Sequence, residues 1–168
     1  MMARRIVLRE PTPDDRRAFL LAVRGSQALH RPWVSPPATP AKFAALLKRM
    51  TTDEYRSFLV CTRDGDEIAG VVNISNIVMG MLRSGHLGYY AFAGFERQGL
   101  MREGIQAVVR LAFSRLTLHR LEANIQPGNA ASIALARSCG FTKEGYSPRY
   151  LKIGGRWRDH ERWAIRAT

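Results

Sequence analysis

The sequence is short of cysteine, of histidine pairs and of long apolar runs. Its two cysteines, Cys61 and Cys139, lie far apart without a Cys-x-x-Cys spacing, which excludes a disulfide framework and a zinc knuckle. The four histidines show no paired metal-ligand spacing, so we predict no metal. No apolar run approaches the roughly 20 residues that cross a bilayer, and residues 1–5 lead into charge, not into a signal core. We therefore expect a cytoplasmic protein without a membrane partner.

Acidic residues are also few relative to basic ones. The chain carries 26 lysines and arginines against 14 acids, for a formal net charge of +12. Such a surplus attracts phosphate-bearing partners. The arginines are nevertheless spread from Arg4 to Arg166, whereas a nucleic-acid binder clusters its charge or interleaves it with aromatics. We expect no direct nucleic-acid binding, although a polyphosphate cofactor and a partner bound to ribosomal RNA would be attracted. Drift in coding composition explains the arginine equally well.

The length of 168 residues and the hydrophobic content of 46% fit one globular domain, and we predict a single domain over residues 1–168. Thr12-Pro13 starts a helix that ends near Gly25, and Thr39-Pro40 starts a second, amphipathic helix. Between them, the prolines of residues 31–37 predict a surface loop. A helical period returns over residues 100–116, and Asn129 caps a last helix that Gly140 ends.

Short β-rich runs bounded by turn residues predict the strands. They fall at residues 6–9, 57–63, 67–77, 86–93, 121–126, 141–151 and 156–165. The resulting order, β-α-α-β-β-β-α-β-α-β-β, predicts an α/β domain with a strand–helix–strand crossover at its centre. We expect a mostly antiparallel central sheet of about seven strands, flanked by about four helices.

The segment 87–102 joins the β-rich run at residues 86–93 to the helix predicted over residues 100–116, through Gly99. The first turn of a helix has unpaired N–H groups and the positive end of the helix dipole, so it accepts phosphate oxygens. Gly99 lets a ligand approach the backbone closely, and Arg97 and Arg102 add positive charge. The Gly-Lys-Ser/Thr ending of a nucleotide P-loop is absent. The segment predicts a phosphate-binding loop, with an ordinary glycine-started helix as the alternative.

Two motifs resemble those of the GNAT superfamily of N-acetyltransferases. Residues 96–101, Glu-Arg-Gln-Gly-Leu-Met, resemble its Gln/Arg-x-x-Gly-x-Gly/Ala pyrophosphate loop, with departures at Glu96 and Met101. Residues 129–141 resemble its Asn-x-x-Ser-Ile…Gly-Phe helix. Within the superfamily, the chain is most similar to the ribosomal-protein-alanine N-acetyltransferases and their serine-directed relatives. The segments that carry this similarity are Arg31-Pro32-Trp33, Gly99-Leu100-Met101, residues 118–124 before Pro127, and residues 155–160.

This resemblance implies a single GNAT-like domain that uses acetyl-CoA as cosubstrate and no metal. It also implies direct attack of a primary amine on the thioester in a ternary complex, so that no covalent nucleophile is needed. The implied cofactor-binding residues lie at the end of the central strand, in the loop and at two helix starts. They are Tyr89, Tyr90, Ala91, Arg97, Gln98, Gly99, Leu100, Met101, Arg102, Asn129 and Ser132.

Catalysis requires that a proton leave the amine, that an oxyanion be stabilised and that the leaving thiolate be protonated. The resemblance assigns the oxyanion to a main-chain N–H where the central strand splays. It assigns the acid to Ser132, the position used by the serine-directed relatives, with Tyr146 as second candidate. The glutamate that another branch uses as base aligns with Asn124, which takes no proton at neutral pH. Glu122, on the same face of that strand, is our candidate base, and an exposed sheet residue is the alternative.

A site without a strong base favours amines that are already partly neutral. An α-amine has a pKa of about 7.7 to 8.0 and is roughly a tenth deprotonated at pH 7, whereas lysine, near 10.4, is free at about a few parts in ten thousand. We therefore predict the N-terminal α-amine of a protein, such as a ribosomal protein, as acceptor. A small-molecule amine and a non-catalytic acetyl-CoA-binding module are the alternatives. Trp157 and Trp163 fit either a homodimer contact or core packing.

Overall fold

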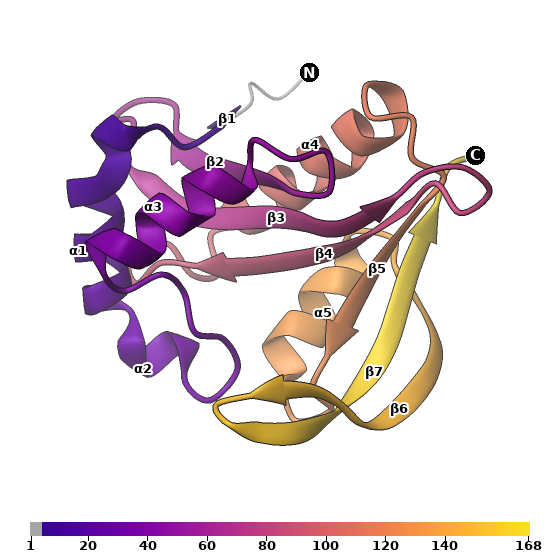
Figure 1. The fold of residues 1–168 in the computed structure, drawn as a ribbon. Coiled ribbons are helices and arrows are strands. Elements are labelled where there is room, and N and C mark those ends of the chain that lie inside the picture. Colours follow the sequence, from indigo (N-terminus) through magenta and orange to yellow (C-terminus); the bar gives the residue numbers. More distant parts are fainter. Residues whose placement is uncertain (1–4) are drawn as a thin grey trace.

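The computed structural model describes residues 5–168. The predictions for the N-terminus and for the start of the domain concern residues 1–4, which lie outside the described residues. The core of the fold is a seven-stranded sheet in the order β1-β2-β3-β4-β5-β7-β6 (Figure 1). Its strands are β1 (Ile6–Arg9), β2 (Arg56–Thr62), β3 (Ile68–Val78), β4 (Ser84–Ala91), β5 (Arg120–Ile125), β6 (Thr142–Ile153) and β7 (Arg156–Arg166). All neighbouring strands pair antiparallel except β4 and β5, which confirms the mostly antiparallel sheet.

The helices confirm the predicted starts and add one short element. They are the 3-10 turn η1 (Pro13–Asp15) and the helices α1 (Arg16–Gly25), α2 (Gln27–His30), α3 (Pro40–Arg49), α4 (Leu100–Ser114) and α5 (Ala130–Ser138). The one-turn α2 has too few residues to show a helical period, so no sequence pattern predicts it. Residues 31–37, which follow it, form the predicted irregular loop.

Local capping explains where α3 and α5 begin and where α5 ends. The side chain of Thr39 accepts a hydrogen bond from the Lys42 N–H at 3.2 Å, and the side chain of Asn129 accepts one from the Ser132 N–H, also at 3.2 Å. Each satisfies an N–H group that has no partner within its helix. Gly140 has a φ of +95° just after α5, a conformation that glycine adopts without steric cost.

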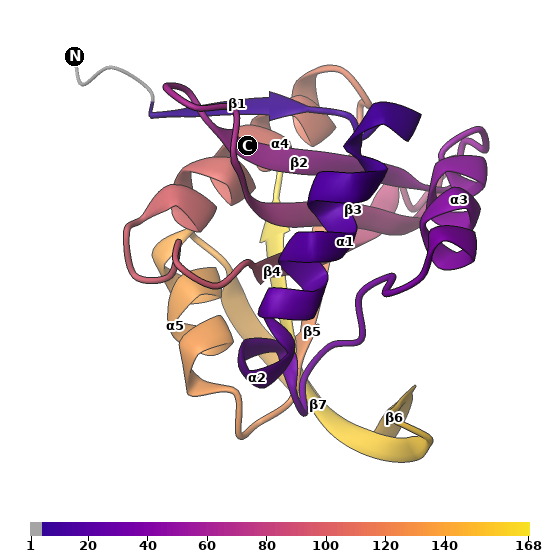
Figure 2. The same ribbon diagram turned by 90° about the vertical axis from the view of Figure 1, so that its left-hand side faces the viewer.

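Two helical layers cover the two faces of the sheet (Figure 2). On one face, α4 buries Ile105, Val108 and Ala112 against residues of the central strands, and Ala136 of α5 joins the same cluster. On the other face, Phe19 of α1 and Phe43 of α3 pack together with ring centroids 4.9 Å apart. Full burial of each large side chain contributes about 1.5 to 3 kcal/mol. The two clusters hold the sheet between the layers and fix β4 in the middle.

Strands β4 and β5 pair over three residues and then separate. The parallel register joins Ser84, Gly85 and His86 of β4 to Arg120, Leu121 and Glu122 of β5. Figure 1 shows the two strands diverging from this end. Residues 87–91 of β4 and 123–125 of β5 pair with their outer neighbours but not with each other, and we call this part of the two strands the fork. Because β4 leads to the start of α4 and β5 leads to the start of α5, the fork lies beside two helix N-termini.

Candidate functional site

The loop between β4 and α4 presents a run of free main-chain donors. Within the described chain, the N–H groups of residues 97–102 have no hydrogen-bond partner. Arg97 and Gly99 both have positive φ, at 59° and 78°. Gly99 is the N-cap of α4 and has no capping side chain. Unpaired donors at a helix N-terminus form a ready anion site.

The shape of this loop is held by three hydrogen bonds from its own neighbourhood. The Ala93 N–H donates to Ser26 Oγ at 2.8 Å, the Gly94 N–H donates to a carboxylate oxygen of Glu96 at 2.6 Å, and Gln98 Nε2 donates to the Gly94 carbonyl at 2.8 Å. Hydrogen bonds from the N–H groups of Glu96 itself and of Gly94 lower the pKa of the Glu96 carboxyl. Glu96, where the family has glutamine or arginine, therefore directs its charge into its own loop.

Met101, the second departure from the family pattern, places its side chain in the core. It is buried, and a Cβ on Gly70 would lie 2.3 Å from its sulfur. The side chain of Leu100 is buried as well. Both residues therefore present main-chain donors alone to the loop. Arg97 and Arg102 are exposed, and neither guanidinium forms an ion pair anywhere in residues 5–168, so both are available to an anion.

Tyr89 of β4 reaches across the fork to Ser132 in the first turn of α5. Ser132 Oγ donates to Tyr89 Oη at 2.9 Å, and Tyr89 Oη donates to the Ser132 carbonyl, also at 2.9 Å. Burial raises the pKa of Tyr89 to about 12 against the opposing effect of the Ser132 hydrogen bond, so its hydroxyl is protonated at neutral pH. The two hydroxyls form a hydrogen-bonded pair beside the fork.

The end of β4 is also held by residues on the face of the sheet that α1 and α3 cover. The carbonyl of Ala91 accepts a hydrogen bond from His30 Nε2 at 2.7 Å, which requires the proton on that nitrogen. The Tyr90 ring lies on the same face, with its centroid 5.3 Å from that of His30. Tyr90 Oη is buried without a partner in the described part of the chain. Sequence reasoning did not identify His30, because its partner is 61 residues away and no local pattern marks the contact.

Glu122 and Asn124 lie on one face of β5, as the period of two predicts, but at different places relative to the fork. Glu122 belongs to the last pair of the β4–β5 ladder, opposite His86. Its carboxylate accepts from Arg120 Nε at 2.9 Å and lies 3.7 Å from His86 Nε2. Asn124 lies inside the fork, and its Oδ1 is buried without a partner among residues 5–168. The base role of Glu122 stays a prediction.

Tyr146 is not brought together with the other site residues. It lies on β6, which β7 separates from β5, and its side chain is half exposed. Its hydroxyl donates to Asp159 Oδ2 at 2.5 Å, and this bond raises the pKa of Tyr146. No hydrogen bond in the described structure joins it to Tyr89 or Ser132. Its role as acid stays a prediction.

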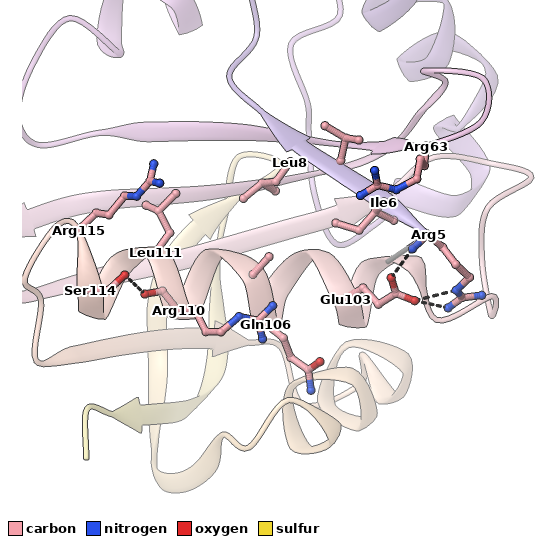
Figure 3. Close-up of a pocket in the computed structure, with 12 residues that line it drawn as sticks. Arg5, Ile6, Leu8, Arg63, Glu103, Gln106, Arg110, Leu111, Ser114 and Arg115 are labelled. Atoms are coloured by element: carbon pink, nitrogen blue, oxygen red, sulfur yellow. Dashed lines mark hydrogen bonds and ion pairs between the residues drawn. The ribbon is translucent and has the colours of Figure 1, made fainter. Parts of the chain in front are cut away.

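A basic groove lies between β1 and α4, on the side of α4 that contacts β1. Its volume is about 1010 Å³. Arg5 Nε donates to Glu103 Oε1 at 2.7 Å. Figure 3 shows this pair and further arginines along the groove. These are Arg63, Arg110 and Arg115. Part of the positive charge is thus gathered here, and it reaches the loop at Arg5, whose Nη2 would lie 3.1 Å from a Cβ on Gly99.

Residues 5–168 contain neither a metal-binding cluster of side chains nor a helix that could span a membrane. No group of three or more histidine, cysteine, aspartate or glutamate side chains there is arranged to hold a metal ion. Both cysteines are buried, and burial raises the pKa of each thiol, to about 11 for Cys61. No helix in the same residues is long and apolar enough to cross a bilayer.

Comparison with known proteins gives matches along most of the chain. The family described as the acetyltransferase (GNAT) domain matches residues 5–142. A Bacillus subtilis protein named "Probable N-acetyltransferase YjcK" is 36% identical over 118 residues, which are 70% of this chain and 65% of that protein. The ribosomal protein uS5 alanine N-acetyltransferase of Escherichia coli is 42% identical over 97 residues, which are 58% of this chain and 50% of that enzyme. The chain thus spans half to about two thirds of these relatives.

Among solved structures, Mycobacterium smegmatis RimJ in complex with CoA-disulfide has a TM-score of 0.88 and 26% identity. The superposition covers 96% of this chain and 82% of that chain. The fold, the loop between β4 and α4, and the match to the family model all agree. The chain therefore belongs to the acetyltransferase (GNAT) domain family.

Proposed function

We propose that the chain is an acetyl-CoA-dependent N-acetyltransferase, a single domain over residues 1–168, whose acceptor is the N-terminal α-amine of a protein. The observation that carries the proposal is the run of unpaired N–H groups at residues 97–102, directly after a strand that separates from its neighbour. A ribosomal protein is the first candidate acceptor, because the Escherichia coli relative acetylates an alanine of ribosomal protein uS5.

The residues around the loop fit coenzyme A. The donors of residues 97–102 and the guanidinium groups of Arg97 and Arg102, which have no ion-pair partner among residues 5–168, suit a diphosphate. The CoA-bound RimJ structure supports this assignment by its similarity to this chain. When bound, acetyl-CoA supplies a thioester carbonyl that is open to attack by an amine.

The chain's own side chains then divide the proton transfers. Ser132 Oγ, whose proton lies toward Tyr89 in the free chain, turns to give that proton to the departing sulfur and takes one back from water, while Tyr89 keeps its own proton. Asn124 Oδ1 has a free lone pair in the fork and accepts a hydrogen bond from the attacking amine. An amide accepts no proton at neutral pH, so the amine proton leaves to water, with Glu122 as the candidate base if a carboxylate takes it.

This arrangement favours an α-amine over a lysine side chain. Arg120 Nε already donates to the Glu122 carboxylate at 2.9 Å, and an amine would compete with this donor for it. Roughly a tenth of an α-amine is already in the neutral form at pH 7. A small-molecule amine remains the alternative acceptor. A non-catalytic acetyl-CoA-binding module is the second alternative, since the described site holds no strong base.

The experiment that tests the proposal incubates the purified chain with acetyl-CoA and a panel of amines, followed by mass spectrometry. The panel holds peptides with the N-termini of ribosomal proteins, the same peptides with blocked N-termini and an internal lysine, spermidine, an aminoglycoside and free amino acids. We expect acetylation of the free N-terminal peptides and none of the blocked ones. Products from the small amines alone would replace the acceptor class, and the absence of any product with bound acetyl-CoA would favour the non-catalytic module.

The proposal includes two further predictions, a cytoplasmic location and a homodimer. A cytoplasmic location rests on the two isolated cysteines of the sequence. A homodimer rests on exposed apolar residues of the terminal hairpin: Trp157 is 61% exposed, whereas Trp163 is buried in the core. Of the two tryptophans, Trp157 is therefore the one available for such a contact.

A further inference from the structure

We propose that a pocket on the α1/α3 face of the sheet binds a carboxylate of the acceptor, so that the enzyme selects amines that carry an acidic group near the reacting nitrogen. This inference rests on the proposed function and defines its acceptor more narrowly. The pocket has a volume of about 380 Å³ and lies between the loop at residues 34–37, helix α3 and strands β3 and β4. We call it the acceptor pocket.

Buried polar atoms without partners mark this pocket as a binding site. Tyr90 and Asn73 both line it, and Tyr90 Oη and Asn73 Oδ1 are buried without a hydrogen bond in the described residues. Tyr90 is 8% exposed. Buried polar groups in proteins are nearly always hydrogen-bonded, because leaving one unpaired costs its full desolvation penalty. A ligand that fills the pocket would satisfy both atoms.

The hydroxyl groups of the pocket are donors at neutral pH. Burial raises the pKa of Tyr90, and it also raises the pKa of Tyr55, which lines the pocket too. A protonated phenol donates well to a carboxylate oxygen. Asn73 Oδ1 instead needs a donor, such as a peptide N–H. The pair therefore suits a residue that combines a carboxylate with a main-chain amide.

The charges of the pocket have one sign. Lys42 and Arg49 of α3 line it, and no acidic residue does. Neither cation forms an ion pair in residues 5–168, although the Arg49 guanidinium lies 3.9 Å from the centroid of the Tyr55 ring. A cation attracts an acidic group and repels another cation that enters the same pocket. The pocket therefore favours an acidic group and disfavours the additional cations of a polyamine.

Tyr90 connects the pocket to the fork. Its main chain lies in the part of β4 that does not pair with β5, and its side chain lines the pocket. One residue of extended chain covers at most about 3.6 Å. A group that binds Tyr90 while the amine lies at the fork therefore belongs to one of the first residues of the acceptor.

The test compares kcat/KM for matched peptides that differ only in glutamate or glutamine at the second or third position. We expect the wild-type chain to prefer a glutamate peptide by about tenfold or more. The double variant Lys42→Gln, Arg49→Gln should reduce this preference to about twofold or less. Lys48→Gln, on the same helix but outside the pocket, is the matched control, and Arg49→Lys should retain the preference because it retains the charge.

The outcomes separate the pocket from the proposed activity. Equal kcat/KM for the glutamate and glutamine peptides in the wild type, or a preference that survives the double variant, overturns the pocket and leaves the acetyltransferase standing. Acetylation of neither peptide overturns both. Free glutamate and free glutamine form a separate arm: glutamate turnover equal to that of the peptide identifies a small acceptor as the source of the carboxylate. Thermal unfolding of each variant checks that the fold is retained.

Discussion

Ser132 Oγ on α5 donates a hydrogen bond to Tyr89 Oη on β4 at 2.9 Å, and Tyr89 returns one to the Ser132 carbonyl at the same distance. The pair joins the central strand to the helix that follows β5, past the point where β4 and β5 stop pairing. It places two protonated hydroxyls at the fork. The structure thus gives Ser132 a neighbour that the sequence does not reveal, since 43 residues separate the two.

Replacement of Ser132 by alanine tests its role as acid. We expect kcat to fall about a hundredfold, within the range for loss of a positioned general acid, because the leaving sulfur loses its proton donor. The dissociation constant of acetyl-CoA should change by less than about threefold, since the free donors of residues 97–102 are untouched. Steady-state kinetics and calorimetry measure the two quantities.

The control for this variant is Ser138→Ala on the same helix, where Oγ donates to the Leu135 carbonyl and the side chain is exposed. Ser132→Ala should also lose about 1 kcal/mol of stability from its hydrogen bond to Tyr89. Full turnover in Ser132→Ala would remove this serine from the mechanism.

Glu122→Gln distinguishes a base from a structural residue. Glu122 and Glu144 both bind Arg120, which links β5 to β6 across β7. We expect kcat/KM to fall by less than about threefold, because a glutamine still accepts the hydrogen bond from Arg120. A fall of more than about a hundredfold would identify Glu122 as the general base.

The dependence of turnover on pH reports which amine is used. With a peptide acceptor, kcat/KM should rise from pH 6 and level off above about pH 8, as the α-amine loses its proton. Tyr89 should cause no decline below about pH 11, because its pKa is raised to about 12 and the hydroxyl keeps its proton until then. A rise that continues to about pH 10 would instead indicate a lysine acceptor.

A matched pair of substitutions at Gly99 separates charge from shape. Asparagine and aspartate have similar size and both tolerate the positive φ of 78° found there better than other residues do. Gly99→Asp should bind acetyl-CoA at least about tenfold more weakly than Gly99→Asn, because only aspartate repels the diphosphate. Calorimetric titration provides both constants. Equal affinities in the two variants would contradict the phosphate assignment.

Much of the fold follows from local sequence chemistry. Thr39, Asn129 and Gly140 act at helix ends in the way that their side chains or lack of one predict. The strand–helix–strand crossover around Gly99 and its free donors were likewise predictable, because they depend on a glycine, a helix start and the residues between them.

The parts that could not be predicted depend on contacts between distant segments. The fork arises from the register of β4 against β5, which no local pattern specifies. The hydrogen bond from His30 to the Ala91 carbonyl and the fit of Met101 against Gly70 depend on tertiary packing in the same way. Tyr89 and Tyr90 are neighbours in the sequence, and the period of two of a strand predicts that they point to opposite faces of the sheet. This period did not reveal that one meets Ser132 and the other lines a pocket.

The central claim is that the main-chain N–H groups of residues 97–102 bind the diphosphate of coenzyme A. A crystal structure of the chain with coenzyme A at saturating concentration tests it most directly. The account predicts phosphate oxygens within about 3.2 Å of these nitrogens. A diphosphate bound elsewhere, for example in the arginine-lined groove between β1 and α4, with the loop donors still unpaired, would contradict the account.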